Sequence, residues 1–300
     1  MRGIVLAGGA GSRLRPATSA ACKQLLPVYD KPMVYYPISV LMLAGIREIL
    51  LISTPEDLPS FRRLLGDGTH LGLRLEYAVQ DAPRGLADAF RIGADFVADE
   101  NVALVLGDNL FHGSGFSDVL TRCVRDLDGA VLIGYEVDDP RGYGVAEIDD
   151  WGRLLSLEEK PRHPRSRLAV TGLYFYDPLV VEIARSLRPS ARGELEITDV
   201  NRTYLEAGRA SLVALGRGYA WLDTGTHESL LEASQFVQTL ERRQGVRIAC
   251  LEEIALRQGL IGAEECLELG LRLTGSEYGG YVVGVARSFL DEGPTVLEAV

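Results

Sequence analysis

Residues 3–16 read GIVLAGGAGSRLRP, an apolar run that stops at three glycines within four positions and continues into two arginines. Short apolar runs bounded by glycine are typical of buried strands. A glycine-rich turn after a strand commonly binds phosphate, because its backbone N–H groups can point inward and a ligand can approach closely. The stretch therefore predicts a buried strand that opens onto an anion site. A tight strand exit with solvated arginines is the alternative that the loop alone leaves open.

Two familiar phosphate loops do not fit these residues. The Walker loop ends in GK[ST], whereas residues 11–14 read GSRL. The dinucleotide fingerprint GxGxxG would begin at Gly9, but position 14 is leucine and the turn does not run straight into an amphipathic helix. What remains is a glycine turn followed by the cations Arg13, Arg15 and Lys23. Several cations beside such a turn favour a polyphosphate ligand.

Beyond the loop, apolar runs alternate with helix-like segments. The expected strands are residues 4–7, 48–53, 73–80 and 103–109, and the expected helices between them are 37–46, 55–66 and 85–97. This alternation predicts a largely parallel sheet covered on both faces. From residue 130 the pattern becomes strand-rich, at 130–137, 143–149, 154–161 and 168–177, which predicts an antiparallel extension. Helices are expected again at 178–186 and 198–208, then short strands at 211–215 and 219–223.

The last third predicts a change to helices. Thr226 is a good N-cap for a long helix, and Gly245 is a plausible stop. We therefore expect a catalytic domain over residues 1–245, with a sugar-binding part at about 130–225. A C-terminal helical region is expected over 246–287, and residues 288–300 are expected to form a tail that can be disordered.

Composition restricts the class of function. The chain has 300 residues, of which 47% are hydrophobic and 24% charged, and its net charge is −11. An acidic balance argues against a nucleic-acid-binding surface, and no apolar run is long enough for a membrane span. Four cysteines without CxxC spacing predict reduced thiols, and no signal-peptide pattern is present, so we expect a cytoplasmic protein.

Several motifs in the same order resemble the sugar-nucleotide pyrophosphorylases. They are GGAGSRLRP (8–16), KQLLPVYDKPMVYYPISVLMLAGI (23–46), QDAPRGLADAF (80–90), LVLGDNLFHG (104–113), SLEEKP (156–161), AVTGLYFYD (169–177), PSARGELEITDVN (189–201) and GRGYAWLDTGTHESLLEAS (216–234). The resemblance implies an α/β fold with a mixed, mainly parallel Rossmann-like sheet, a sugar-binding subdomain and C-terminal helices. It covers residues 1–285.

The resemblance also implies a reaction. The motifs are most similar to family members that join dTTP to glucose 1-phosphate with Mg²⁺, releasing pyrophosphate, in deoxysugar biosynthesis. Such members suggest a homotetramer, with no nucleic acid or membrane partner. The resemblance implies that the catalytic residues are Arg13, Lys23, Asp108 and Lys160.

Carboxylates at two expected strand ends are candidate metal ligands. Asp108 and Asp223 each end a strand-like run, and Mg²⁺ commonly uses one or two carboxylates. From the segment alone, a turn capped by Asp108 and Asn109 is the more frequent outcome. The resemblance implies that these two aspartates hold the metal.

Other residues carry the substrates. The Gln80 amide can donate to and accept from a pyrimidine edge. Glu159 can hold a sugar hydroxyl and Lys160 a phosphate, although a solvated charge pair is the common alternative. The resemblance implies nucleotide contacts at Gly8, Gly9, Gly11, Ser12, Arg13, Gln80, Gly85, Leu86 and Asp108. It implies sugar-phosphate contacts at Asn109, Tyr143, Gly144, Glu159, Lys160, Val170, Thr171 and Arg192.

Three alternatives stay open at this point. A uridylyl- or cytidylyltransferase would use the same sugar phosphate, because Gln80 alone does not separate uracil from thymine. A glycosyltransferase would need a DxD motif after a strand, whereas Asp126–Asp128 follows a helix-like stretch. A non-catalytic sensor would be expected to lack the charged residues of the reaction, and this chain keeps them.

Overall fold

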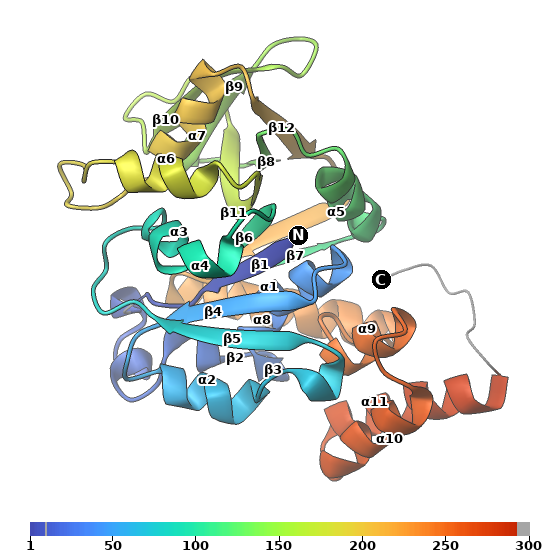
Figure 1. Ribbon diagram of the computed structural model, residues 1–300. Helices are drawn as coiled ribbons and strands as arrows, with labels where there is room; N and C mark the ends of the chain where they lie inside the picture. Colours follow the sequence, from blue (N-terminus) through green and yellow to red (C-terminus); the bar gives the residue numbers. More distant parts are fainter. Residues whose placement is uncertain (10, 293–300) are drawn as a thin grey trace.

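The computed structural model describes residues 1–9 and 11–292, which form a central mixed sheet flanked by helices (Figure 1). The described residues build a nine-stranded sheet in the order β10-β9-β11-β6-β1-β4-β5, with β8 pairing with β11 and β12. Its strands are β1 Arg2–Leu6, β4 Glu48–Ser53, β5 Arg74–Val79, β6 Val102–Leu106, β8 Ala130–Glu136, β9 Gly144–Ile148, β10 Leu154–Glu159, β11 Leu168–Tyr176 and β12 Ala210–Leu215. The predicted fold class is confirmed.

Strand directions follow the change of pattern near residue 130. β1 pairs in parallel with β4 and β6, and β4 pairs in parallel with β5. β11 runs antiparallel to β6, β8 and β9, as expected for the strand-rich part. β12 returns parallel to β8. The carboxyl ends of the parallel strands therefore lie at one edge, where ligands bind in open α/β sheets.

Both faces of the sheet are buried. Val5 of β1 belongs to one apolar core, together with residues of α1, α2, α5 and α9–α11. Its neighbours Ile4 and Leu6 belong to a second core with residues of α3, α4, α6 and α7. Successive strand residues point to opposite faces, so burial on both sides requires a continuous apolar run. That is why residues 3–7 carry no polar side chain.

The helices lie close to their expected positions. They are α1 Tyr35–Leu43, α2 Leu58–Leu65, α3 Asp88–Ile92, α4 Ala94–Val97, α5 Phe116–Arg125, α6 Val180–Ser186, α7 Ile197–Glu206, α8 His227–Gln244, α9 Leu251–Arg257, α10 Ala263–Arg272 and α11 Glu277–Glu292. The single helix expected at 85–97 is two short helices, because the chain leaves helical geometry at Gly93. Thr226 caps α8, and Gly245, at φ 72°, ends it as predicted.

The strand expected at residues 103–109 was predicted to end too late. β6 stops at Leu106, Gly107 and Asp108 form a turn, and a new strand, β7 (Asn109–Gly113), starts at once. β7 pairs antiparallel with β13 (Tyr219–Asp223), which places Asp223 opposite Asn109. A short hairpin of β2 (Pro27–Val28) and β3 (Lys31–Pro32) precedes α1. Asp108 therefore lies in a turn between two strands and does not end one.

The C-terminal helices extend from the main body at the lower right of Figure 1. α9 packs on α1, and α10 and α11 pack against each other. Residues 288–292 of the expected tail continue α11, and residues 293–300 lie outside the described residues, as does Ala10 of the glycine loop. Across the described ranges, every helix is too short or too polar to cross a bilayer.

Candidate active site

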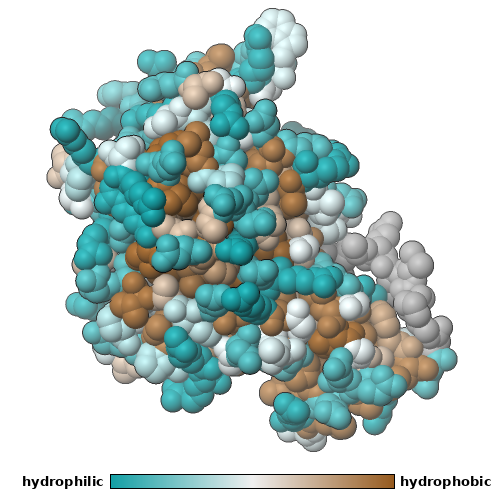
Figure 2. Space-filling model, in the orientation of Figure 1, coloured by the Kyte–Doolittle hydropathy of each residue, from teal (hydrophilic) through white to brown (hydrophobic). Residues whose placement is uncertain are grey.

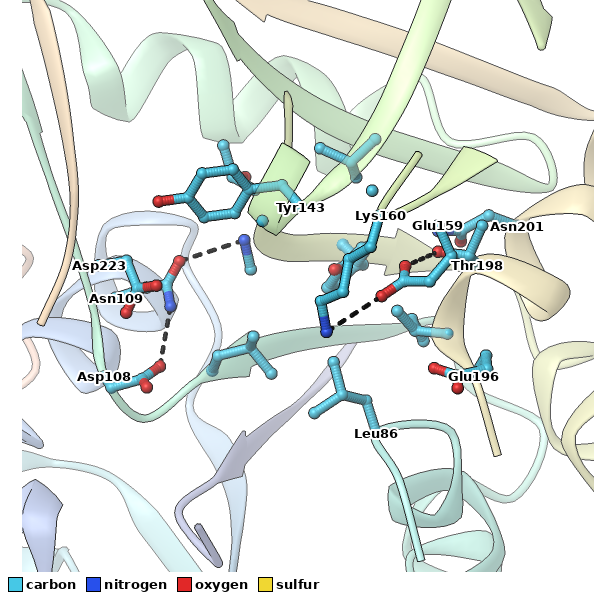
Figure 3. A pocket seen from close by; sticks show the side chains of 18 of the residues that line it. Leu86, Asp108, Asn109, Tyr143, Glu159, Lys160, Glu196, Thr198, Asn201 and Asp223 are labelled. Atoms are coloured by element: carbon cyan, nitrogen blue, oxygen red, sulfur yellow. Dashed lines mark hydrogen bonds and ion pairs between the residues drawn. The ribbon is translucent and has the colours of Figure 1, made fainter. Parts of the chain in front are cut away.

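A cavity of about 420 Å³ is bordered by the ends of β6 and β10, the start of β9 and the middle of β11. It brings together twelve of the predicted site residues: Arg13, Leu86, Asp108, Asn109, Tyr143, Gly144, Glu159, Lys160, Val170, Thr171, Arg192 and Asp223. Figure 3 shows Asp108, Asn109 and Asp223 on one side of this cavity, with Glu159, Lys160 and Thr198 on the other. The site therefore has a carboxylate end, formed by the two aspartates, and an opposite end where Lys160 and Arg192 pair with glutamates.

At the carboxylate end, the β7–β13 ribbon brings two aspartates close together. The backbone N–H and the hydroxyl of Thr224, which follows Asp223, donate to the Asp108 carbonyl at 3.1 and 2.9 Å. Burial and then the neighbouring Asp108 carboxylate raise the pKa of Asp223 above its ordinary value. Two carboxylates that repel each other in this way form an oxygen-donor pair suited to a divalent cation.

This donor set fits Mg²⁺ bound with a phosphorylated ligand. Within residues 1–9 and 11–292 there is no group of three or more acidic, histidine or cysteine side chains arranged for a metal. Mg²⁺ does not need one, because it usually takes one or two carboxylates and completes its shell with phosphate oxygens and water. Asp108 and Asp223 are therefore the residues that could hold the ion.

Two cations from the N-terminal loop border the carboxylates. The Nζ of Lys23, a buried side chain, lies 2.5 Å from Asp108 Oδ2. The Arg13 guanidinium lies near Asp223. Both groups lie next to Gly225, where an added Cβ would be 2.9 Å from Arg13 Nη2 and 2.9 Å from Asp223 Oδ1. Both cations lower the pKa of Asp223, against the larger effects of burial and Asp108.

The glycine loop needs glycine at its turn. Gly11 has φ +57°, and a Cβ there would lie 2.8 Å from Thr18 and 3.1 Å from the Lys23 side chain. The next residues, Ser12–Leu14, form a 3₁₀ turn whose Leu14 is fully buried. Leu14 thus anchors the loop, while Arg13 remains exposed at the cavity.

At the other end, cations and carboxylates pair with one another. Lys160 Nζ lies 3.4 Å from Glu159 Oε1, and Arg192 Nη2 lies 2.7 Å from Glu196 Oε2. Thr198 donates to Glu159 Oε2 at 2.6 Å. Lys160 has φ +44°, a left-handed conformation unusual for a side chain of this size, directly after β10. That turn directs the ammonium toward the cavity (Figure 3).

Seven predicted residues do not line this cavity: Gly8, Gly9, Gly11, Ser12, Lys23, Gln80 and Gly85. Several of them gather beside it, after β1 and β5. A Cβ added to Gly8 would lie 2.9 Å from Gln80 Oε1, so the Gly8 backbone lies close to the side-chain amide of Gln80. Gln80 is buried, and its Nε2 donates to Asp88 Oδ2 at 3.2 Å. Gly85, at φ +98°, passes so close to the Leu195 backbone that only glycine fits.

Sequence reasoning assigned no role to several lining residues. They are Gly172, Tyr174, Glu194, Glu196, Ile197, Thr198, Asn201 and Trp221. Most of them lie within the motifs AVTGLYFYD and PSARGELEITDVN. Their position inside these motifs is the sequence signal that could have identified them. Trp221 is mostly buried, yet it lines the cavity, and the centroid of its ring lies 5.0 Å from that of Tyr143.

Comparisons with known proteins agree with this geometry. The nucleotidyl transferase family model matches residues 2–239. A glucose-1-phosphate thymidylyltransferase from Neisseria meningitidis serogroup A is 56% identical over 94% of this chain and 98% of its own length. The enzyme of the same name from Xanthomonas campestris pv. campestris is 56% identical over 95% and 97%.

Solved structures show the same fold. A Bacillus anthracis protein, assigned as a glucose-1-phosphate thymidylyltransferase and crystallised with a sucrose, is 39% identical, with a TM-score of 0.73 over 79% of this chain and 94% of its own. A UDP-glucose pyrophosphorylase bound to UDP-glucose is 25% identical, with a TM-score of 0.68 over 79% and 98%. The chain therefore belongs to the nucleotidyl transferase family and, within it, to the glucose-1-phosphate thymidylyltransferases.

Proposed function

We propose that this chain transfers a thymidylyl group from dTTP to glucose 1-phosphate, forming dTDP-glucose and pyrophosphate. The relatives that match along nearly the whole chain carry this name. The observation that carries the proposal is one cavity with Arg13 and two aspartates at one end and Lys160 and Arg192 at the other. Two anionic substrates that repel each other can be brought together there.

At the sugar end, Lys160 and Arg192 would seat the phosphate. Both cations pair with carboxylates in this structure, with Glu159 and Glu196, and a phosphate would offer them a doubly charged partner. Glu159 would then be available to sugar hydroxyls, with Thr198 holding its other oxygen. Val170, Thr171, Tyr143 and Gly144 would close around the ring.

At the nucleotide end, the loop would hold the triphosphate. Amides of residues 8–12 would lie beneath it, Arg13 would stabilise charge on the leaving phosphates, and Lys23 would act near the reacting centre. Gln80, Gly85 and Leu86 would bind the base. Asp108 and Asp223 would hold Mg²⁺, whose charge would screen the negative charge of the two substrates.

The transfer requires alignment of the two substrates and no general base. A sugar-phosphate oxygen forms a bond to the α-phosphorus of the nucleotide, and the bond from that phosphorus to the bridging oxygen breaks. Pyrophosphate leaves with the electron pair. Because the attacking oxygen is already an anion, no proton has to be removed. The protein supplies orientation and neutralisation of charge.

We also infer the larger assembly. Residues 1–245 would form the catalytic domain, with the sugar-binding part at about 130–225, and residues 246–287 a helical region that contributes to a homotetramer. Support comes from exposed apolar side chains in this region: Leu271 of α10, Leu273 directly after α10, and Leu290 of α11. Figure 2 shows hydrophobic surface over the C-terminal helices at its lower right. Light scattering of the purified protein tests the tetramer.

Four free, buried cysteines support a reducing compartment such as the cytoplasm.

A nucleotide panel tests the reaction. The protein is incubated with glucose 1-phosphate, Mg²⁺ and, in turn, dTTP, UTP, CTP, ATP or GTP, and pyrophosphate is measured. We expect the highest kcat/KM with dTTP. A preference for UTP or CTP would reassign the base, and no pyrophosphate with any nucleotide would refute the proposal. Lys160→Ala should raise the KM for glucose 1-phosphate, whereas Arg165→Ala, on an exposed loop and paired with Glu147, should not.

A further inference from the structure

Asn109 connects three strands and a turn at the carboxylate end of the cavity. The residue is 4% exposed. Its Oδ1 accepts from the Trp221 indole N–H at 2.6 Å and from the Gly172 backbone N–H at 3.2 Å. Its Nδ2 donates to Asp108 Oδ1 at 2.9 Å. An asparagine amide has two acceptor positions and two donor hydrogens, so three of its four positions are used.

These partners determine which way the amide faces. Trp221 and Gly172 present only N–H groups, and Asp108 presents only oxygen. A rotated amide would oppose donor to donor and acceptor to acceptor, and all three bonds would be lost. The Oδ1 pocket is also tight, because a Cβ added to Gly172 would lie 2.7 Å from this atom. The N–H direction toward Asp108 is therefore built into the surrounding strands.

The same residue is linked to both aspartates. Asn109 lies opposite Asp223 in the β7–β13 ribbon, while its side chain holds the Asp108 carboxylate. The other Asp108 oxygen is bound by Lys23 at 2.5 Å, so both oxygens have a fixed donor. Groups that hydrogen-bond metal-binding carboxylates orient them and strengthen metal binding.

We propose that Asn109 is a positioning residue for the Asp108–Asp223 pair, and that Trp221, through its indole N–H, keeps the Asn109 amide turned toward Asp108. The inference rests on the proposed function for the role of the pair as a metal site. It connects Trp221, in the wall of the cavity, through Asn109 to the aspartates that would hold the metal. Among the described residues, the second N–H of Asn109 meets no acceptor, so it can donate to a substrate oxygen.

Metal affinity tests the proposal without turnover. Mn²⁺ binding to the whole protein is measured by water-proton relaxation, for the unmodified chain and for Asn109→Ala, Trp221→Phe and Val170→Ala. We expect Asn109→Ala to raise the Mn²⁺ dissociation constant about tenfold or more, the range found for partners of metal ligands. Trp221→Phe keeps the amide but removes its orienting donor, so a smaller loss in the same direction is expected.

Val170→Ala is the matched control, because Val170 lines the same cavity from β11 and carries no polar group. Its Mn²⁺ affinity should equal that of the unmodified chain. Equal affinity in all four proteins would overturn the proposal, as would absence of Mn²⁺ binding by the unmodified chain. If Asn109→Ala does not fold, as judged by thermal unfolding, Trp221→Phe decides the outcome alone.

The nucleotide panel separates this inference from the proposed function. If dTTP and glucose 1-phosphate give no pyrophosphate but Asn109→Ala still weakens Mn²⁺ binding, the reaction is wrong and the positioning role holds. If turnover is normal and Asn109→Ala changes neither Mn²⁺ affinity nor the Mg²⁺ concentration needed for half-maximal rate, the reaction holds and the positioning role is wrong.

Discussion

Arg13 is an exposed side chain beside the carboxylate end of the cavity, and its role can be separated from the fold. Leu14, its buried neighbour, anchors the loop, so Arg13→Ala should still fold, with only a small decrease in the thermal unfolding temperature because Asp223 loses a neighbouring cation. We expect kcat to fall on the order of a hundredfold, because one donor to developing charge is lost. Initial rates of pyrophosphate release with saturating substrates measure this. Near-normal turnover would remove Arg13 from the reaction, and Arg15→Ala serves as a neighbouring control.

Asp223 is a partly buried carboxyl whose function opposes stability. Its pKa is raised, by burial first and by Asp108 second, from a reference value of 3.8. The folded state therefore binds this proton more tightly than the unfolded state does. Folding loses stability as pH rises from the unfolded pKa through the raised folded pKa, and the loss is complete above it.

Asp223→Asn should accordingly raise the free energy of unfolding at pH 7. The difference from the unmodified chain should shrink as pH falls toward the ordinary range of a carboxyl group. Urea unfolding at several pH values in metal-free buffer measures it. The same variant should need far more Mg²⁺ for activity. A variant that is less stable at pH 7, or whose Mg²⁺ requirement is unchanged, would contradict this reading.

At the scale of elements, α8 shows how a local signal specifies a helix end. The Thr226 side chain accepts from the Ser229 backbone N–H at 3.1 Å, and the Ser229 hydroxyl accepts from the Thr226 N–H at 3.0 Å. This reciprocal pair satisfies two N–H groups that the first helical turn leaves free. The signal is contained within four consecutive residues, which is why it could be read from the sequence.

Thr226→Ala should lower the free energy of unfolding by about 1 kcal/mol, the usual cost of losing an N-cap. Urea denaturation measures the change, and Thr226→Ser, which keeps the hydroxyl, should lose much less. Equal stability of all three proteins would mean that packing of α8 alone holds its first turn.

At the scale of the whole molecule, a buried charge cluster joins the β2–β3 hairpin to the C-terminal region. Glu241 of α8 contacts Lys31 Nζ at 2.9 Å and Arg247 Nη1 at 2.7 Å. Arg247 also contacts Asp30 Oδ2 at 2.9 Å. Lys31 and Glu241 are almost completely buried. Removing one partner from such a cluster leaves an uncompensated buried charge, which is more costly than the pair itself.

Glu241→Gln should therefore lower the free energy of unfolding by about 3–5 kcal/mol, the range for breaking a buried ion pair. Replacing both partners, as Lys31→Met with Glu241→Leu, should recover most of that loss, because Arg247 still forms its ion pair with Asp30. Guanidinium unfolding of the three proteins measures this. A double variant less stable than the single one would show that the two charges do not compensate each other.

The parts of this protein that the sequence alone determined are those with local causes. The apolar run at residues 3–7 predicted a strand buried on both faces, since every residue of such a strand needs an apolar side chain. The glycines after it and the Thr226 cap were readable for the same reason, because a turn or a helix end depends on a few neighbouring residues. Motif resemblance added the family and the roles of the charged residues.

The tertiary structure decided what depends on distant pairing. The separation between Asp108 and Asp223 is set by β7 and β13. β7 was missed because it starts only two residues after β6 and contributes just two large apolar side chains, Leu110 and Phe111. Trp221 and Asn109, 112 positions apart in the chain, show no sign in the sequence that they share a hydrogen bond. Hydrophobic periodicity reports which face of an element is buried. It does not report which element lies against that face, so only the folded chain shows the two aspartates and their orienting amide together.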